Sequence, residues 1–477
     1  MMVAAIPVIP LLAALAVLLF RHPTTARLIT AAGGLATLLL SIDLAQQVNH
    51  RVDLVVLPGW VGVNGLSALI LVLQGFVAMT ATIYSWGYMK HQARAGEARE
   101  RRYYLNLNLF LSSLFLVPIF LQPALTWVAV ELTTVLSVFL VSFDSTPQAL
   151  EAAWKYAIIT IMGATVAVLG IFLLLWGLSL AHVAVQTWAS LKATAPLMPP
   201  LLLKLAFVLI LIGFGTKVGI VPMHTWLPDA HSQAPSSVCA LLSGIEVSTI
   251  LYVIMRLWPV FAWIPGSFAQ HWALAFGLLS VGVAAFLMIQ VHDFKRLFAF
   301  STVEQMGIVL VALGLGPAGG YASLYQVLTH AVTKSLAFYS AGAVLLTTGT
   351  RDIASVKGLI RVSPVSAMSL LFSGLAIAGA PPFAIFLSEL SIFRSTWQTG
   401  HILVLVLLLG FLTVAFLGVL LKVNRMVFGQ SHHRPVSLPL TIRFALLVGW
   451  LPVLVFGVYL PRPMHHLLTL AALTLRR

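Results

Sequence analysis

Apolar runs recur along the whole chain and are separated by short polar segments. Most runs have about 17–25 residues, which as a helix is long enough to cross a hydrocarbon layer of about 30 Å. The pattern therefore predicts an all-α polytopic membrane protein with about fourteen transmembrane helices. We expect these helices near residues 2–20, 26–47, 65–88, 104–121, 124–142, 152–177, 201–222, 236–258, 270–290, 296–316, 321–348, 364–397, 402–424 and 440–460.

The composition agrees with a membrane protein. Of the 477 residues, 60% are hydrophobic and 8% are charged, and the mean hydropathy is +1.01, whereas a soluble domain has about 25% charged residues. The formal net charge of +14 would suggest a nucleic-acid partner in a soluble protein. Most of the Lys and Arg, however, lie in short loops between apolar runs, so we expect them to orient the helices and expect no nucleic-acid partner.

The basic loops follow alternate helices, which predicts the topology. They lie at Arg21 and Arg27, Lys90 to Arg102, Lys295 and Arg296, Arg351 to Arg361, and Lys422 to Arg434. By the positive-inside rule these loops face the cytoplasm. We therefore expect a multi-pass protein of a bacterial or archaeal cytoplasmic membrane with both termini on the outer side.

The sequence contains no motif for a redox cofactor. Cys239 is its single cysteine, which excludes an internal disulfide and an iron–sulfur cluster held by this chain's own thiolates. No nucleotide, haem or metal motif is present, and no nucleophile or phosphate-binding loop stands outside the helices. We expect no cofactor, no metal site and no catalytic residue in this chain.

Two of the apolar runs are interrupted by glycine and proline. The run at 201–222 contains Gly213, Gly215, Gly219 and Pro222, and the run at 364–397 contains Gly379-Ala-Pro-Pro-Phe. Such residues break backbone hydrogen bonds, and a break inside a bilayer survives only where protein or water satisfies the freed groups. In transporters, discontinuous helices at corresponding positions of two halves indicate the ion path.

Ionisable residues stand far from any loop in several predicted helices. A charge at the centre of a spanning helix costs about 3 kcal/mol, so such residues usually mark a proton or ion path. Interfacial snorkelling or a purely structural ion pair is the alternative for each, and snorkelling is the better reading for Lys155 and Lys204, which begin apolar runs. The candidates are Glu131, Lys217, Glu246, Glu304, His330, Lys334 and Glu389.

The chemistry of these groups favours protons. A lysine in a dry site loses or binds a proton as a nearby carboxylate moves or changes charge, and Lys217 facing Glu131 would form such a pair. His330 and Lys334 are four residues apart and share a helix face, which we expect to point toward the helix at 364–397 and its Glu389. His224, in the loop after the first interrupted run, and Lys295 are further candidates for the relay.

Three segments resemble signature blocks of the antiporter-like subunits of complex I, of multi-subunit cation/proton antiporters and of membrane-bound hydrogenases. They are the stretch from Gly215 to Ser236, the stretch His292-Asp-Phe-Lys295 to Gly307, and His330-Ala-Val-Thr-Lys334. Within this superfamily, Glu151 to Tyr156, Gly349 to Ile353 and Gly379 to Glu389 resemble the hydrogenase-4 component F type.

The resemblance implies two inverted five-helix repeats with broken helices 7 and 12. The implied parts are residues 1–103 (helices 1–3), 104–258 (helices 4–8), 259–425 (helices 9–13) and 426–477 (helix 14 and tail). It also implies roles for the candidates: Glu131 and Lys217 as the input pair, His330 and Lys334 as the central relay, and Glu389 as the output. Many relatives have a lysine in helix 8 where this chain has Ser248. The gap between Lys217 and His330 would then be crossed by water, by other polar groups or by Glu246. We expect Glu246 to turn inward and to pair with a buried cation, for which Lys217 is the nearest candidate.

The resemblance implies a proton-translocating subunit of a redox-driven complex, most similar to a group 4 nickel-iron hydrogenase or a complex I relative. Its partners would be further antiporter-like membrane subunits and a peripheral redox arm carrying iron–sulfur clusters and nickel-iron. The alternative is transport without electron transfer, by a sodium/proton antiporter or a bicarbonate-uptake partner. The residues of the relay do not discriminate between the two, nor between protons and sodium.

Overall fold

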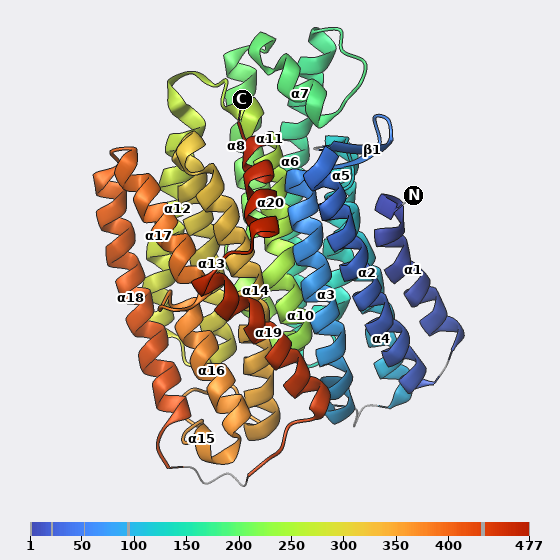
Figure 1. The fold of residues 1–477 in the computed structure, drawn as a ribbon, viewed down its shortest axis with the longest axis vertical. Coiled ribbons are helices and arrows are strands. Elements are labelled where there is room, and N and C mark those ends of the chain that lie inside the picture. Colours follow the sequence, from blue (N-terminus) through green and yellow to red (C-terminus); the bar gives the residue numbers. More distant parts are fainter. Residues whose placement is uncertain (1, 21, 52, 93–95, 431–434, 477) are drawn as a thin grey trace.

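A computed structural model describes residues 2–20, 22–51, 53–92, 96–430 and 435–476. It forms a bundle of long, roughly parallel helices, with the N-terminal helices at one side and α18 at the other (Figure 1). Within these residues, eleven helices are long and apolar enough to span a membrane. The predicted fold class, an all-α polytopic membrane protein, is confirmed.

The helices fall in chain order close to the predicted runs. Those of the first half are α1 (Met2–Leu19), α2 (Pro23–Arg51), α3 (Gly65–Gln92), α4 (Glu97–Leu116), α5 (Pro123–Val141), α6 (Pro147–Leu180), α8 (Pro200–Val218), α9 (Trp226–Gln233), α10 (Ser236–Leu241) and α11 (Val247–Phe261). Those of the second half are α12 (Phe268–Gln290), α13 (Phe294–Gly314), α14 (Gly320–Thr348), α16 (Pro364–Ile377), α17 (Ala384–Gln398), α18 (Ile402–Val427) and α19 (Leu440–Val458).

Several shorter elements were not expected from the sequence. A β-hairpin pairs β1 (Asp53–Leu57) with β2 (Val61–Asn64), α7 (Trp188–Thr194) caps the bundle, and α20 (Arg462–Leu473) follows α19. Turns of 3-10 type lie at Ala195–Leu197, Pro265–Ser267 and Gly316–Ala318, and α15 is a single turn at Leu359–Val362. These elements are too short, or too polar, for the twenty-residue apolar pattern to detect.

Helix starts follow ordinary capping chemistry. Proline occupies the first turn of α5, α6, α8 and α16, where its missing N–H costs nothing. Thr146 accepts from the N–H of Ala149 at the start of α6, and Asp293 accepts from the N–H groups of Lys295 and Arg296 at the start of α13. α4 begins earlier than predicted, because the charged segment from Glu97 onward is helical as well.

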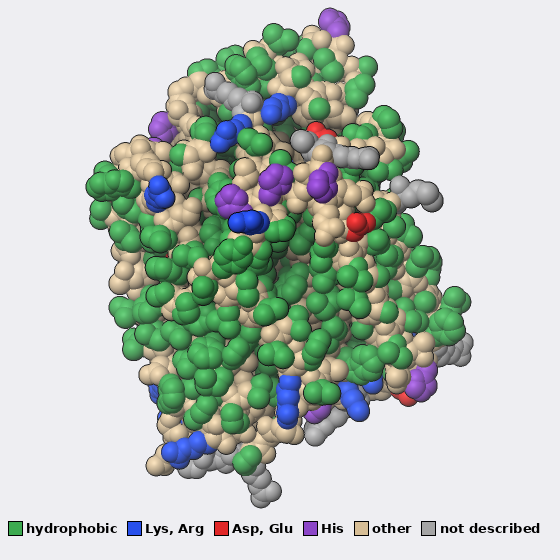
Figure 2. Space-filling model, in the orientation of Figure 1, with side chains coloured by type: hydrophobic (Ala, Val, Ile, Leu, Met, Phe, Trp, Pro, Cys, Tyr) green, Lys and Arg blue, Asp and Glu red, His purple; other side chains and the backbone are tan. Residues whose placement is uncertain are grey.

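The helices differ in how much of their surface is buried inside the bundle. The membrane segments of α3, of α10 to α11 and of α13 are 89%, 100% and 94% buried, whereas that of α18 is 22% buried. α14 is buried over nearly its whole length. Figure 2 shows hydrophobic side chains covering the middle of the visible face, with charged and histidine side chains toward the two ends. Glu246, Glu304, His330 and Lys334 therefore lie on the most buried segments, whereas Glu131 lies on α5, whose membrane segment is 44% buried.

Both termini lie at the end of the bundle opposite α15 (Figure 1). This arrangement agrees with an even number of crossings. α15 lies within the predicted basic loop at Arg351 to Arg361. The predicted basic residues Arg21, Arg94 and Arg434 fall outside the described residues.

Of the two interrupted apolar runs, the one at 201–222 contains a single helix that ends before Gly219, and the one at 364–397 is divided into two helices. α8 ends at Val218, Gly219 adopts a left-handed conformation with φ of +82°, and α9 begins only at Trp226. The indole N–H of Trp226 donates to the carbonyl of Thr216 at 2.8 Å, and the N–H of Val221 donates to Ser280 Oγ at 3.0 Å. Protein groups thus satisfy the freed backbone, as a break inside a membrane requires. The second run is divided between α16 and α17, with Gly379 at φ of +71°.

Close glycine contacts bring neighbouring helices together in both halves of the chain. A Cβ added at Gly213 of α8 would lie 2.4 Å from the backbone nitrogen of Ala167 on α6. Gly277 of α12 and Gly307 of α13 approach each other in the same manner, each Cβ meeting the other's carbonyl at 2.8 Å. Small residues at such crossings let membrane helices pack backbone to backbone.

Gly213→Ala should therefore destabilise the protein by about 1–3 kcal/mol, the usual cost of overpacking, because the new methyl group meets backbone that cannot rotate away. The measurement is the thermal unfolding midpoint of the purified protein in detergent. The matched control is Gly410→Ala on α18, where an added Cβ has nothing within 4 Å. Equal midpoints for the two variants would contradict the packing argument.

Candidate functional site

Lys217 and Glu131 form the expected ion pair. Lys217 is in the last turn of α8, next to the break, and its side chain is 2% exposed. Its Nζ donates to Glu131 Oε1 at 2.9 Å, to the carbonyl of Val130 at 3.0 Å and to the hydroxyl of Thr134. All three acceptors are on α5. An ammonium ion has three donors, so every proton of this buried charge is used.

Glu246 lies in the interior, as predicted, but it does not pair directly with Lys217. Its Oε1 accepts a hydrogen bond of 3.0 Å from the hydroxyl of Tyr156 on α6, and its Oε2 has no protein partner among the described residues. The Tyr156 hydroxyl also lies 2.7 Å from Ser137 Oγ on α5. The ion pair of Lys217 is with Glu131, so pairing of Glu246 with a buried cation stays a prediction.

Sequence reasoning missed Tyr156 as a functional residue. The residue appears in the stretch Glu151 to Tyr156 that resembles relatives, which was the available signal. A tyrosine in an apolar run gives no charge to notice, and its partners come from α5 and from the segment after α10, far away in the sequence.

The segment that carries Glu246 is a π-helical turn, Leu242–Glu246, between α10 and α11. Such turns often occur at functional sites, because they displace the backbone from the regular ladder. His330 Nε2 lies 2.9 Å from the carbonyl of Ser243 inside this turn. His330 Nδ1 has no protein partner within the described chain. The π turn therefore carries Glu246 and also contacts α14 through His330.

Lys334, one turn after His330, is fully buried and is held by α13. Its Nζ donates to the carbonyl of Phe298 at 3.0 Å and to the hydroxyl of Ser301. Glu304, on the same helix, is 3% exposed and within electrostatic reach of Lys334. The two lysines are thus bound alike, each by a carbonyl and a hydroxyl of a neighbouring helix.

His330 and Lys334 do not point toward the helix at 364–397, so that expectation is wrong. Their nitrogen atoms are bonded to α13 and to the π turn. The hydroxyl of Thr329 instead contacts α17, 2.8 Å from Ser388 Oγ. The direction reverses because α13 and the π turn lie on the other side of the buried α14.

Glu389 is beside the second break. It is 6% exposed, and its Oε2 would be 2.3 Å from a Cβ at Gly379. The carboxylate therefore occupies the space that glycine leaves at the turn between α16 and α17. On the neighbouring α13, the side-chain carbonyl of Gln305 accepts from the amide of Gln326 on α14. The Gln305 amide nitrogen is buried and has no hydrogen-bond partner among the described residues.

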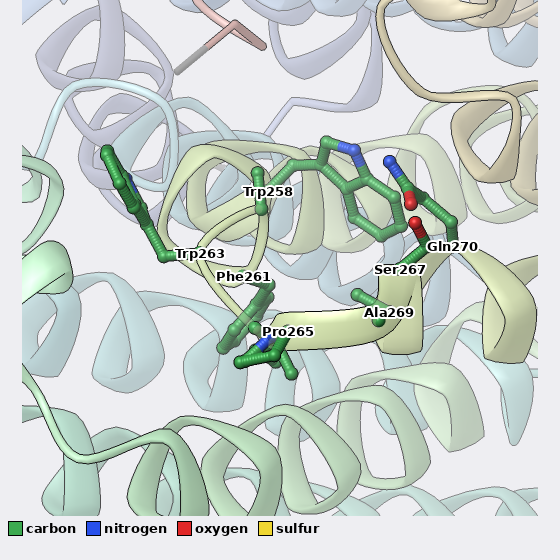
Figure 3. A pocket seen from close by; sticks show the side chains of 10 residues that line it. Trp258, Phe261, Trp263, Pro265, Ser267, Ala269 and Gln270 are labelled. Carbon is green, nitrogen blue, oxygen red and sulfur yellow. The ribbon is translucent and has the colours of Figure 1, made fainter.

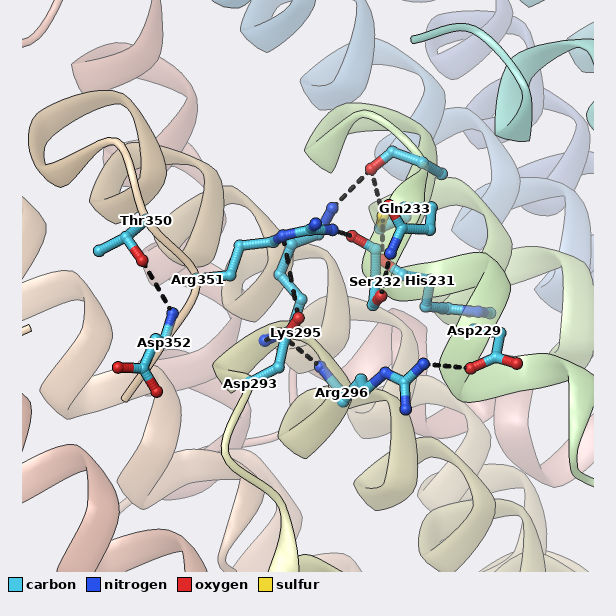
Figure 4. Close-up of polar contacts among 12 residues, drawn as sticks. Asp229, His231, Ser232, Gln233, Asp293, Lys295, Arg296, Thr350, Arg351 and Asp352 are labelled. Carbon is cyan, nitrogen blue, oxygen red and sulfur yellow. Dashed lines mark hydrogen bonds and ion pairs between the residues drawn. The ribbon is translucent and has the colours of Figure 1, made fainter. Parts of the chain in front are cut away.

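A second group of charges closes one end of the bundle (Figure 4). Asp229 of α9 pairs with Arg296 of α13 and lies 3.3 Å from Lys155 of α6. Arg351 donates to the carbonyl of Ser232 at 2.5 Å. These contacts tie the two halves of the chain together next to the first break.

The remaining candidates, Lys295 and His224, lie near this end, together with the neighbouring His231. Lys295 is 2% exposed and donates to the carbonyl of Ala234 at 2.5 Å. His231 is buried, with Nδ1 2.8 Å from the carbonyl of Leu227, whereas His224 is partly exposed in the loop before α9. None of the three contacts Lys217 through a protein hydrogen bond within the described residues.

A cavity of about 240 Å³ lies at the C-terminal end of α11, the end away from the π turn (Figure 3). Trp258, Trp263, Pro265 and Gln270 are among the side chains that line it. None of the buried ionisable candidates does so. The described residues include no cluster of three or more His, Cys, Asp or Glu side chains that could hold a metal ion.

Lys217, Glu246, His330, Lys334 and Glu389 are all buried. Lys217 lies next to the first break and Glu389 next to the second, and all five side chains can bind and release protons. Hydroxyl and amide groups lie between the charged groups. The arrangement suits proton transfer between sites rather than binding of a metabolite.

Comparison with known proteins gives the same picture. The family described as NADH:quinone oxidoreductase/Mrp antiporter, TM matches residues 123–416. The hydrogenase-4 component F homolog of Methylacidiphilum infernorum is 33% identical over 412 residues, 84% of this chain and 85% of that one. The Na(+)/H(+) antiporter subunit A1 of Staphylococcus haemolyticus is 31% identical over 71% of this chain, but the alignment spans only 43% of that longer subunit.

Solved structures share the fold. A chain of the membrane-bound sulfane sulfur reductase, an archaeal respiratory membrane complex, superposes with a TM-score of 0.89 at 23% identity, covering 99% of this chain and 97% of its own length. A chain of the Mrp complex from a Dietzia species gives a TM-score of 0.87 at 18% identity, with the same coverage. The chain belongs to the NADH:quinone oxidoreductase/Mrp antiporter family, as an antiporter-like membrane subunit.

Proposed function

We propose that this subunit translocates protons through its buried band of glutamate, lysine, histidine and hydroxyl groups. The observation that carries the proposal is the pair of buried lysines, Lys217 and Lys334, each bonded to a neighbouring helix beside buried carboxylates. Charges are kept in a membrane interior at a cost of about 3 kcal/mol each, and proton relays are a principal reason for keeping them.

In this account Glu131 and Lys217 load the proton. Their ion pair is 2.9 Å long and lies next to the first break. Opening of the pair would leave a buried ammonium ion without its counter-charge, which favours release of its proton. The charged contacts of Asp229 at the nearby end would guard access from that side, with His224 and Lys295 as further groups on the approach.

Glu246 takes the place of the helix 8 lysine that many relatives have. Its free oxygen, Oε2, and the free nitrogen of His330, Nδ1, are both buried. Buried polar atoms of this kind are usually satisfied by water. Water between them would carry the proton on to Lys334, near Glu304, and then to Glu389 at the second break, which releases it.

We further propose that the subunit works in a redox-driven complex of the hydrogenase-4 or complex I type. The likeness to a hydrogenase-4 component F homolog over most of both chains supports this reading. Iron–sulfur and nickel-iron centres would then belong to partner subunits, and both termini of this chain would face outward. The alternative is a sodium/proton antiporter without electron transfer, which the likeness to an antiporter subunit A1 favours.

Lys217→Ala and Glu131→Gln should each reduce proton translocation toward background, because each removes one member of the loading pair. The measurement is acidification of liposomes that contain the purified complex, with partner subunits verified by gel. Lys204→Ala is the matched control: this lysine is near the start of α8 and stacks over Phe268. Full translocation by either relay variant would remove that residue from the path.

Affinity purification of the tagged chain should recover subunits with iron–sulfur and nickel-iron centres. The reason is that the redox-driven reading assigns all electron transfer to partners. Mass spectrometry of the purified complex, together with its iron and nickel content, is the measurement. Recovery of antiporter subunits alone, without these metals, would favour the sodium/proton reading instead.

A further inference from the structure

Tyr156 has a position that ordinary packing does not require. Its side chain is 1% exposed, and its ring contacts Trp226 with centroids 4.8 Å apart. The hydroxyl at the end of this fixed ring bonds to Glu246 Oε1 at 3.0 Å and to Ser137 Oγ at 2.7 Å. Tyr156 therefore contacts both the carboxylate of Glu246 and α5, the helix whose groups accept the hydrogen bonds of Lys217.

Thr134 completes the connection to Lys217. Its hydroxyl accepts a hydrogen bond from Lys217 Nζ, and its carbonyl accepts from Ser137 Oγ, which lies 2.7 Å from the Tyr156 hydroxyl. Lys217, Thr134, Tyr156 and Glu246 thus form a series of neighbouring exchangeable groups, in which the step from Thr134 to Tyr156 requires the two hydroxyls to move into hydrogen-bond distance. The charged ends of the series come from α8 and from the π turn, and the hydroxyls come from α5 and α6.

We propose that the Tyr156 hydroxyl carries the proton between Lys217 and Glu246. This inference rests on the proposed proton path, and it names the group that bridges the position where many relatives have a lysine. It assigns Tyr156 a direct part in transfer, with Thr134 as the intervening hydroxyl and Ser137 as the group that sets the direction of the tyrosine O–H bond.

The transfer balances as a single proton. The Lys217 ammonium gives a proton to Thr134 Oγ1, which passes its own proton to Tyr156 Oη, which passes its own to the Glu246 carboxylate. Lys217 ends as a neutral amine and Glu246 as a neutral acid. Both hydroxyls keep one proton each.

Ser137 allows the series to reset. Ser137 Oγ lies 3.1 Å from the carbonyl of Thr134, to which it donates, and 2.7 Å from Tyr156. When Glu246 is charged, Tyr156 donates to it. When Glu246 is protonated, its O–H donates to Tyr156, Tyr156 donates to Ser137, and Ser137 donates to the Thr134 carbonyl. After a transfer the new O–H bond of Thr134 points toward Lys217 and that of Tyr156 toward Thr134, so both O–H bonds rotate before the next transfer.

Tyr156→Phe tests the inference, because it keeps the ring and its contact with Trp226 but removes the hydroxyl. The complex is purified with its partners and reconstituted into phosphatidylethanolamine/phosphatidylglycerol liposomes. Proton flux is driven by a potassium diffusion potential and followed with an internal pH dye. We expect the flux to fall by at least about tenfold, in keeping with loss of a positioned proton-transfer group.

Tyr252→Phe is the matched control. Tyr252 is equally buried, and its hydroxyl is 2.9 Å from Ser67 Oγ and donates to the carbonyl of Pro118, with no carboxylate partner among the described residues. Its variant should stay within about twofold of the unmodified chain. A second readout excludes a merely structural role: the infrared band of protonated Glu246, identified by its loss in Glu246→Gln, should appear more slowly after a pH jump in Tyr156→Phe but reach the same amplitude.

Full flux in Tyr156→Phe would overturn the inference about this residue. Loss of flux in Lys217→Ala, measured beside it, would leave the wider proton path standing, whereas full flux in Lys217→Ala would overturn the path itself. If Tyr156→Phe does not assemble, Thr134→Val makes the same test against Thr160→Val, whose hydroxyl donates only to the carbonyl of Tyr156. Equal flux in those two variants would then overturn the inference.

Discussion

The cost of keeping charge away from water is the constraint on which this structure depends. Lys217 meets it with three acceptors from α5, including the carboxylate of Glu131 at 2.9 Å. Lys334 meets it with a carbonyl and a hydroxyl from α13. These bonds require the neighbouring helices to approach closely, and glycines such as Gly213 provide the space. The hydrogen bonds of the buried lysines thus depend on close packing of the helices that supply the acceptors.

The helix interruptions serve the same constraint. In a continuous helix the backbone carbonyl and N–H groups bond to one another. Such a helix would leave no turn beside which a carboxylate can lie. At the second break Glu389 occupies the volume next to Gly379. At the π turn, the Ser243 carbonyl becomes the partner of His330. Departures from regular helix therefore occur where ionisable side chains need partners.

Much of the fold was predictable because each spanning helix is its own apolar run, and the run length follows from membrane thickness. The buried ionisable residues were predictable for a related reason: a charge inside an apolar run is conspicuous in one dimension. Lys217 and Glu131 were paired correctly, with help from the family resemblance. The division into two inverted repeats stays a prediction.

Contacts among uncharged groups were not predictable. Tyr156 has no charge, and nothing in its local sequence indicates that it meets Glu246, which lies ninety residues later. The predicted direction of the His330 and Lys334 side chains was wrong. The spacing of residues on a helix fixes which side chains project together, but it does not fix which neighbouring helix they contact. The π turn was missed as well, since it has no sequence signal comparable to a glycine–proline break. These features depend on how helices are placed around α14.

The central claim is that one path of buried groups crosses from the first half of the chain to the second, and Glu246 is where it crosses. Proton flux through liposomes containing the assembled complex with Glu246→Gln tests this most directly. Glutamine has the same shape but does not bind and release a proton at this position, so the account predicts flux near background with partner subunits still bound. Flux equal to that of the unmodified complex would contradict it.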